Sequence, residues 1–219
     1  MSTTIAISEN KAPIIQELYD NTEMAVKQDQ INVILNQPPP QKWIKEHPYV
    51  RGHMYLPIDK VEFMLKRLFK KTRIEILREG VSFNGVYVVV RVWYQDILTG
   101  EMDFHDGIGA IQMQTAKGTS PADLGNINNG AISMAYPIAK TLALKDACDH
   151  FGSVFGANLN RKDYLPFGPD EKLSQTAEEK RLLKLIDVAQ SIEDLNEIAT
   201  HVTETTQDKF DKKWEQLKK

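Results

Sequence analysis

The spacing of apolar and polar residues divides the centre of the chain into one helix followed by three strands. Within 57–71, apolar residues recur three or four positions apart, which predicts a helix that begins near Pro57. Residues 72–83, 85–96 and 102–113 are rich in the valine, isoleucine and aromatic side chains typical of strands. Asn84-Gly85 and the segment 98–101 predict tight turns between these strands. We therefore expect an antiparallel meander.

A three-stranded meander needs a cover on one of its faces. Residues 114–130 are polar and predict a long loop, whereas 131–151 are rich in alanine, leucine, isoleucine and methionine and predict a helix. Pro137 predicts a kink or a late start in that helix. The expected fold class is α+β: a three-stranded antiparallel meander covered by a long helix (a β-β-β-α core), with a helical C-terminal region.

The segments on either side of this core have a different character. Pro13 favours a helix start, and the proline run 38–40 predicts an extended linker or strap. Thr176 and Glu179 form a capping-box pattern for a later helix, and 207–219 predicts another. We expect an N-terminal arm and linker over 1–41, the core over 42–168 and a helical region over 169–219. A narrow apolar seam is expected in the last region, made of Leu185, Val188, Ile192, Leu195, Ala199 and Val202.

Charge follows the same division. The whole chain of 219 residues has a net charge of -3, but residues 42–168 carry 16 basic and 13 acidic side chains. The flanks, with 2 basic and 5 acidic and with 9 basic and 12 acidic side chains, are acidic. The single cysteine, Cys148, excludes an internal disulfide and favours a reducing compartment. No apolar stretch approaches the ~20 residues of a membrane span, and no signal peptide is evident, so we expect a cytoplasmic protein.

The densest charge lies in 60–78, where seven basic residues stand against Glu62 and Glu75. Such a stripe could track a phosphate backbone, or it could be a solvated helix face. Arg91 lies among strand aromatics that could stack on unpaired bases or fill a core. Both alternatives remain open for each feature.

Evidence for catalysis is slight. Asp103, His105 and Asp106 lie close together on one predicted strand, which would suit a metal or a general base, or a structurally paired strand end. The sequence offers no second cluster to complete such a site. We expect no catalytic residue, no metal ligand, no cofactor and no enzymatic activity.

The segment 139–165, AKTLALKDACDHFGSVFGANLNRKDYL, resembles the Rad-fifty-two family of single-strand annealing proteins, including the phage Sak-type annealases. The preceding order is also similar: a Gly-His entry at Gly52, a helix, three strands, and a strand ending in Gly-x-Gly at Gly107 and Gly109. The resemblance covers about 43–168. The matching residues of the helix motif are Ala139, Thr141, Ala143, Leu144, Lys145, Ala147, Phe151, Gly152, Gly156, Lys162, Asp163, Tyr164 and Leu165.

The resemblance implies a homo-oligomeric ring or filament that binds single-stranded DNA in a basic groove and anneals complementary strands without ATP. Lys145 matches the family's first basic position of the helix, and Arg91 its strand arginine. Asp146, Asp149 and Met54 stand where the family has basic residues, and Leu142 replaces its helix aspartate. The candidate DNA contacts are Arg51, Lys60, Lys66, Arg67, Lys70, Lys71, Arg73, Arg91, Lys117, Lys140 and Lys145.

The expected function is therefore DNA recombination and repair by strand annealing, in a bacterial cytoplasm if the protein is phage encoded. The acidic C-terminal region could recruit a single-strand binding protein or an exonuclease, or could simply pack on itself. One alternative function is a general single-stranded nucleic-acid-binding module without annealing activity. A metal-dependent nuclease built on Asp103, His105 and Asp106 is another.

Overall fold

The computed structural model describes residues 22–48 and 50–218, so the helix predicted after Pro13 lies outside the described residues. The chain divides into two compact units. One is Asn32–Phe167, and the other combines the described residues up to Ile31 with Gly168–Lys219. Helix α1 (Thr22–Leu35) contributes residues to both units.

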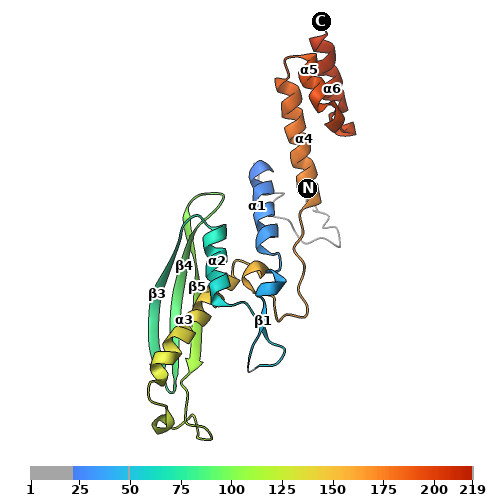
Figure 1. Cartoon of the computed structure of the whole chain (residues 1–219). Coiled ribbons are helices and arrows are strands. Elements are labelled where there is room, and N and C mark those ends of the chain that lie inside the picture. The colour runs from blue at the N-terminus through green and yellow to red at the C-terminus, as the bar shows by residue number, and fades with distance from the viewer. Residues whose placement is uncertain (1–21, 49, 219) are drawn as a thin grey trace, which may run out of the picture. The chain divides into compact units, whose positions relative to one another are not determined.

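The larger unit is built on the predicted meander. Strands β3 (Thr72–Ser82), β4 (Gly85–Gln95) and β5 (Met102–Gln112) form one antiparallel sheet in the order β3-β4-β5 (Figure 1). Ser82 pairs with Gly85, so the first turn consists of Phe83 and Asn84. The predicted Asn84-Gly85 turn is wrong by one residue, because Gly85 already pairs with Gln112 as the first residue of β4.

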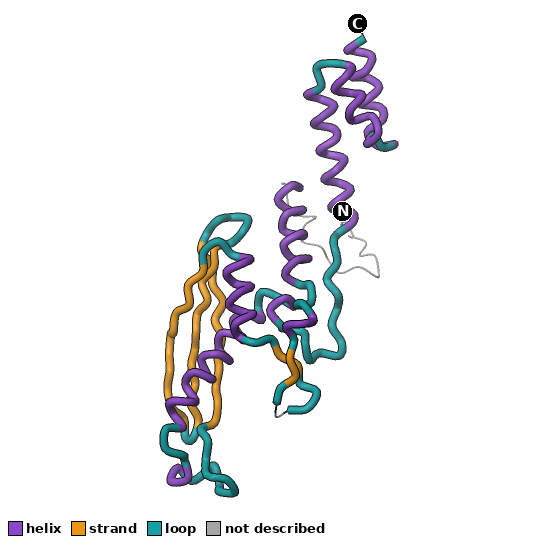
Figure 2. Tube along the Cα trace, viewed as in Figure 1, coloured by secondary structure: helices purple, strands orange, loops and turns teal. Residues whose placement is uncertain are grey.

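Helix α3 (Ala131–Asp149) packs on one face of this sheet, over β4 and β5, and confirms the expected α+β fold (Figure 2). It begins at Ala131 despite Pro137, so the predicted late start is wrong. The β4 residues that face the helix are four buried valines: Val86, Val88, Val90 and Val92. Alternation along the strand leaves Tyr87, Val89, Arg91 and Trp93 on the other face, which we call the open face.

Two glycines bring α3 unusually close to β5. A Cβ atom on Gly107 would lie 2.3 Å from the Ala143 carbonyl oxygen, and one on Gly109 would lie 2.1 Å from the Ala139 carbonyl oxygen. Ala139, Ala143 and Ala147 are four residues apart and fully buried, so they form one helical stripe of small side chains. Backbone therefore packs on backbone, which explains why Gly-x-Gly and the alanine series occur together.

Smaller elements complete this unit. The predicted helix at 57–71 is α2 (Ile58–Leu68), which buries Val61 and Leu65 in the core. Before it, β1 (Lys45–Glu46) and β2 (Met54–Tyr55) form a short hairpin that the sequence did not indicate. Single 3-10 turns lie at η2 (Gln41–Trp43), η3 (Leu124–Asn126) and η4 (Ser153–Phe155).

The helical unit has a core of its own. Helices α4 (Glu171–Val188), α5 (Ile192–Ile198) and α6 (Glu204–Leu217), with the turn η5 (Ala199–His201), enclose Leu182, Ile186, Leu195 and Phe210. The predicted cap at Thr176 is wrong, because Asp170 caps α4 and the Thr176 hydroxyl bonds the Lys172 carbonyl inside the helix.

The predicted seam of the C-terminal region is also wrong as a single helix face. A new helix starts at Ser191, whose side chain forms a capping box with Asp194, so the chain changes direction between α4 and α5. Val188 is 68% exposed, whereas Leu182 and Ile186 are buried. Across the described residues, no helix has the length and apolarity needed to cross a membrane.

Candidate nucleic-acid interface

A groove of about 710 Å³ lies between the β1–β2 hairpin and helix α3. Its lining is largely apolar and also contains one lysine and two histidines. From the hairpin come His47, Pro48, Val50, His53 and Tyr55, and from α3 come Pro137, Ile138, Thr141, Leu142 and Lys145.

A distant asparagine fixes the hairpin wall of this groove. Asn160 follows the Gly156 turn, and its side chain accepts a hydrogen bond from the Met54 amide at 2.7 Å and donates one to the Met54 carbonyl at 2.8 Å. Within the hairpin, the Gly52 amide donates to the Glu46 carboxylate at 2.7 Å. Sequence reasoning missed Asn160, because the only local signal was an asparagine within a turn-forming segment.

Lys145 is the cation of the groove. Its Nζ lies 4.7 Å from the centre of the Tyr55 ring, and its side chain is half-buried. Burial lowers the pKa of Lys145, while the Asp149 carboxylate opposes that shift. Among the described residues, no carboxylate lies within ion-pair distance of Lys145. The groove therefore holds a partly desolvated cation with a cation–π contact and without a bonded anion.

Two aspartates of α3 occupy positions where the resembling family has basic residues. The Asp146 carboxylate accepts a hydrogen bond from the Ile108 amide of β5 at 2.9 Å. Asp146 thus accepts a hydrogen bond from a main-chain amide of an edge strand, so its role is structural. Burial raises the pKa of Asp149 to about 6, and the negative charge of Asp146 is the second cause of this shift.

The other predicted contacts are dispersed over the unit. Arg51 lies at the tip of the β1–β2 hairpin beside Val50, and Lys140 lies exposed on α3. Lys117 is exposed in the loop after β5. Lys60 pairs with Asp59 at 2.9 Å.

The stripe 60–78 is likewise divided. Lys66 and Arg67 end α2, and Lys70 and Lys71 follow it; all are exposed and, within the described part of the chain, none forms an ion pair. Arg73 and Arg78 instead belong to β3. The structure places Lys145 in the groove and the other predicted cations on separate elements and loops.

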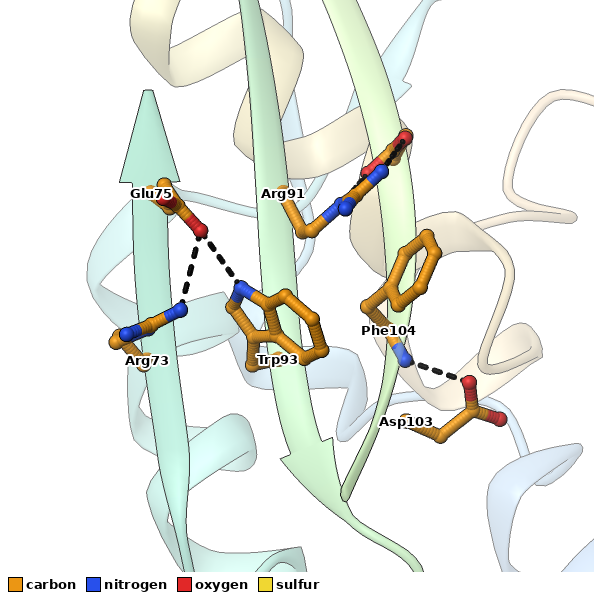
Figure 3. A network of polar contacts seen from close by, with 7 residues as sticks. Arg73, Glu75, Arg91, Trp93, Asp103 and Phe104 are labelled. Carbon is orange, nitrogen blue, oxygen red and sulfur yellow. Dashed lines mark hydrogen bonds and ion pairs between the residues drawn. The ribbon is translucent and has the colours of Figure 1, made fainter. Parts of the chain in front are cut away.

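On the open face of the sheet, Arg91 and Arg73 are already paired with carboxylates (Figure 3). The Arg91 guanidinium donates two hydrogen bonds to the Asp106 carboxylate, at 2.7 and 2.8 Å, and lies 3.6 Å from the centre of the Phe104 ring. This pairing raises the pKa of Arg91 and lowers that of Asp106.

A second group on the open face is joined through Glu75. Its carboxylate accepts hydrogen bonds from Arg73 at 3.2 Å and from the Trp93 indole at 2.8 Å (Figure 3). The aromatics near Arg91 thus divide between faces, because Trp93 lies on the open face whereas Tyr94 contacts Phe69 and Phe151 of the core. Arg78 lies opposite Val89 on the same face and forms no ion pair among the described residues, so only the charges of Arg73 and Arg91 are already balanced.

The strand residues considered for metal chemistry do not converge. Asp106 pairs with Arg91 on the open face, whereas His105 lies on the covered face against Tyr94, His150 and Phe151. Burial and the neighbouring His150 lower the pKa of His105. In the parts of the chain that the structure describes, no group of three metal-ligating side chains comes together.

No protein-family model matches this chain, and no curated protein matches it.

Proposed function

We propose that the protein is a homo-oligomer that binds single-stranded DNA and anneals complementary strands without making or breaking covalent bonds. The observation that carries the proposal is the groove between the β1–β2 hairpin and α3, with Lys145 in it. A half-buried lysine without a bonded carboxylate recovers part of its lost solvation energy when an anion arrives. A phosphate of a nucleic-acid backbone is such an anion.

The chemistry of annealing favours this kind of site. Two strands pair only if their base edges stay free, so the protein must hold sugar and phosphate rather than read the bases. The groove supplies a cation and a largely apolar wall, which suit a backbone without selecting a sequence. Arg51 at the hairpin tip and Lys140 on α3 are the neighbouring cations that could extend the path.

The sheet and α3 favour self-association. Strands β3 and β5 each have 11 residues and, within the described chain, each pairs with one strand only, β4; on the outer edge of β5, Asp146 already bonds the Ile108 amide. Head-to-tail pairing of one copy's β3 with the next copy's β5 would generate a ring or a filament. Helix α3 also exposes two apolar side chains outside the groove lining, Ile132 at 44% and Met134 at 64%. Exposed apolar side chains of this kind are typical of a surface that another chain covers.

In this proposal, the helical unit recruits a single-strand binding protein or an exonuclease in the bacterial cytoplasm. Its groove of about 490 Å³ is lined by Leu182, Leu185 and Ile198 together with Glu178, Glu179 and Arg181. An apolar floor with charged edges suits a peptide segment of another protein.

Titration with labelled oligo-dT at several salt concentrations tests the DNA-binding part. Lys145→Met should weaken binding and reduce the slope of log affinity against log salt by about 0.7 for each phosphate that the variant no longer holds. Lys212→Met, which removes an exposed lysine of α6, should change neither quantity. Absence of oligo-dT binding at low salt would contradict the proposal.

Assembly and annealing need separate measurements. Mass photometry should show particles of several chains, with or without single-stranded DNA. Mixing complementary labelled strands should give duplex faster with the protein than without it. Binding without faster duplex formation would favour the alternative of a general single-strand binding module.

A further inference from the structure

Phe83, the first residue of the β3–β4 turn, combines strain with exposure. Its φ is 52°, in the left-handed region that bulky side chains rarely enter, and its side chain is 89% exposed. Asparagine or glycine would adopt this conformation more easily. The chain thus places an aromatic ring in solvent at a position where the backbone disfavours it.

The contacts that hold the turn do not involve the Phe83 ring. The Met113 amide donates a hydrogen bond to the Asn84 carbonyl at 2.6 Å, and the Asn84 side-chain amide donates to the Pro121 carbonyl. These bonds connect the turn to the strand end and to the loop after β5. The strained backbone is thereby held in place while the ring remains free for another partner.

The ring borders a hollow of about 380 Å³ at this end of the sheet. Tyr87 lines the same hollow and lies over Gly80, where an added Cβ would lie 2.7 Å from the Tyr87 hydroxyl oxygen. The other polar side chains of the lining are Ser82, Asn84 and Gln112, and the lining contains no charged residue. Aromatic surfaces edged by hydroxyl and amide groups suit a flat, neutral heterocycle rather than a phosphate.

Three other exposed or half-exposed rings of the sheet and groove are already covered by cations. Arg91 covers Phe104, Arg73 lies 5.3 Å from the Trp93 ring centre, and Lys145 lies over Tyr55. Phe83 is the most exposed aromatic side chain among the described residues. It is therefore the ring best able to accept a stacking partner from outside the chain.

We infer that the hollow beside Phe83 binds one unpaired nucleobase of the bound strand, stacked on the Phe83 ring. This inference rests on the proposed function and adds to it a contact with a base that depends on stacking rather than on charge. Since such stacking is tolerant of sequence, it is compatible with annealing of any complementary pair.

The test compares Phe83→Asn with Phe83→Trp, using oligo-dT that carries one 2-aminopurine. Asparagine tolerates the turn but lacks a ring, so Phe83→Asn should unfold at a higher urea concentration than the original chain while losing 2-aminopurine quenching. Its affinity for the oligonucleotide should fall about tenfold, with an unchanged salt slope, because every cation that holds a phosphate is still present. Phe83→Trp keeps an aromatic surface and should retain both quenching and affinity.

The outcomes separate this inference from the proposed function. If the original chain binds oligo-dT with a slope that depends on Lys145, and Phe83→Asn binds and quenches equally well, the base-binding hollow is refuted and the groove stands. If Phe83→Asn instead changes the mass of the assembly and leaves quenching intact, the turn contacts another copy, which also refutes it. If the original chain does not bind oligo-dT, the proposed function fails, and this inference fails with it.

Discussion

The two faces of the β3-β4-β5 sheet treat charge in opposite ways. On the side of the sheet that carries α3, burial lowers the pKa of His105 in β5 and of Lys145 in the helix and raises that of Asp149 in the helix, so each group is pushed toward its neutral form. On the open face, Arg91 and Asp106 hold each other in their charged forms. A phosphate would therefore relieve a cost at Lys145, whereas at Arg91 it would have to displace a bidentate carboxylate.

The same contrast holds for packing. The covered face has glycine and alanine where β5 meets α3, and backbone fills the space. On the open face, the long side chains of Arg73 and Arg91 stack on Trp93 and Phe104. We infer that the covered face determines stability, and that the open face tolerates substitution.

Gly109→Val gives the largest expected effect. Its Cβ would lie 2.1 Å from a main-chain oxygen of α3, a clash that only movement of the helix can remove. We expect the free energy of unfolding of the Asn32–Phe167 unit to fall by more than about 4 kcal/mol. Urea unfolding followed by circular dichroism measures it.

Ala110→Val, one residue along on the open face, is the matched control. Ala110 is exposed, so this change should alter the free energy of unfolding by less than about 0.5 kcal/mol. Equal destabilisation of the two variants would remove the distinction between the faces.

Asp149→Asn tests the desolvated charges beside the groove. Because the folded-state pKa is about 6 and the ordinary value is 3.8, the folded chain binds the proton more tightly. Ionisation of Asp149 should therefore lower the free energy of unfolding as pH rises from about 4 to 6, and this loss of stability persists at higher pH. The shift sets an upper limit of about 3 kcal/mol, which solvent screening reduces to about 1 kcal/mol.

The measurement is the free energy of unfolding at several pH values between 4 and 8. Asp149→Asn should flatten the profile and should be more stable than the original chain at pH 7. A variant that is less stable at pH 7 and retains the slope would contradict the assignment.

These expectations depend on features that sequence patterns reveal unequally. Apolar periodicity and β-branched composition predicted α2 and the three strands to within a few residues. Only β4 buries one face along its whole length, whereas β3 buries no residue. The clash distances at Gly107 and Gly109 required the structure, since a Gly-x-Gly strand indicates close approach without naming the partner. Resemblance drew attention to Lys145, but its half-buried position over Tyr55 depends on the hairpin that Asn160 holds.

The misplaced features have local causes. Asn-Gly is such a common turn pair that it obscured Phe83-Asn84, where hydrogen bonds to Met113 and Pro121 override the preference. In α4, the capping-box pattern at Thr176 competed with Asp170, whose side chain accepts bonds from two amides of the first turn. The prediction that Arg91 contacts DNA was based on residues near it in sequence. Its ion-pair partner, Asp106, lies on the adjacent strand.

Asp106→Asn tests the paired charges of the open face and should have a smaller effect than Asp149→Asn. The folded-state pKa of Asp106 is lowered, first by its hydrogen bonds with Arg91. Its stabilising contribution is therefore present above about pH 4 and is lost as pH falls below that. Thermal unfolding of the original chain and of Asp106→Asn should differ slightly at pH 7 and converge near pH 3. A difference that grows toward low pH would refute the pairing.

The finest distinction between the faces is in the salt dependence of oligo-dT binding. Lys145→Met should reduce the slope by about 0.7 for one phosphate contact, since each contact releases counterions on binding. Arg91→Met removes a charge that Asp106 already balances, so its slope should equal that of the original chain. If Arg91→Met reduced the slope and Lys145→Met did not, the bound strand would follow the open face. Paired charge would then be no barrier to phosphate, and Arg91 would replace Lys145 as the cation that holds it.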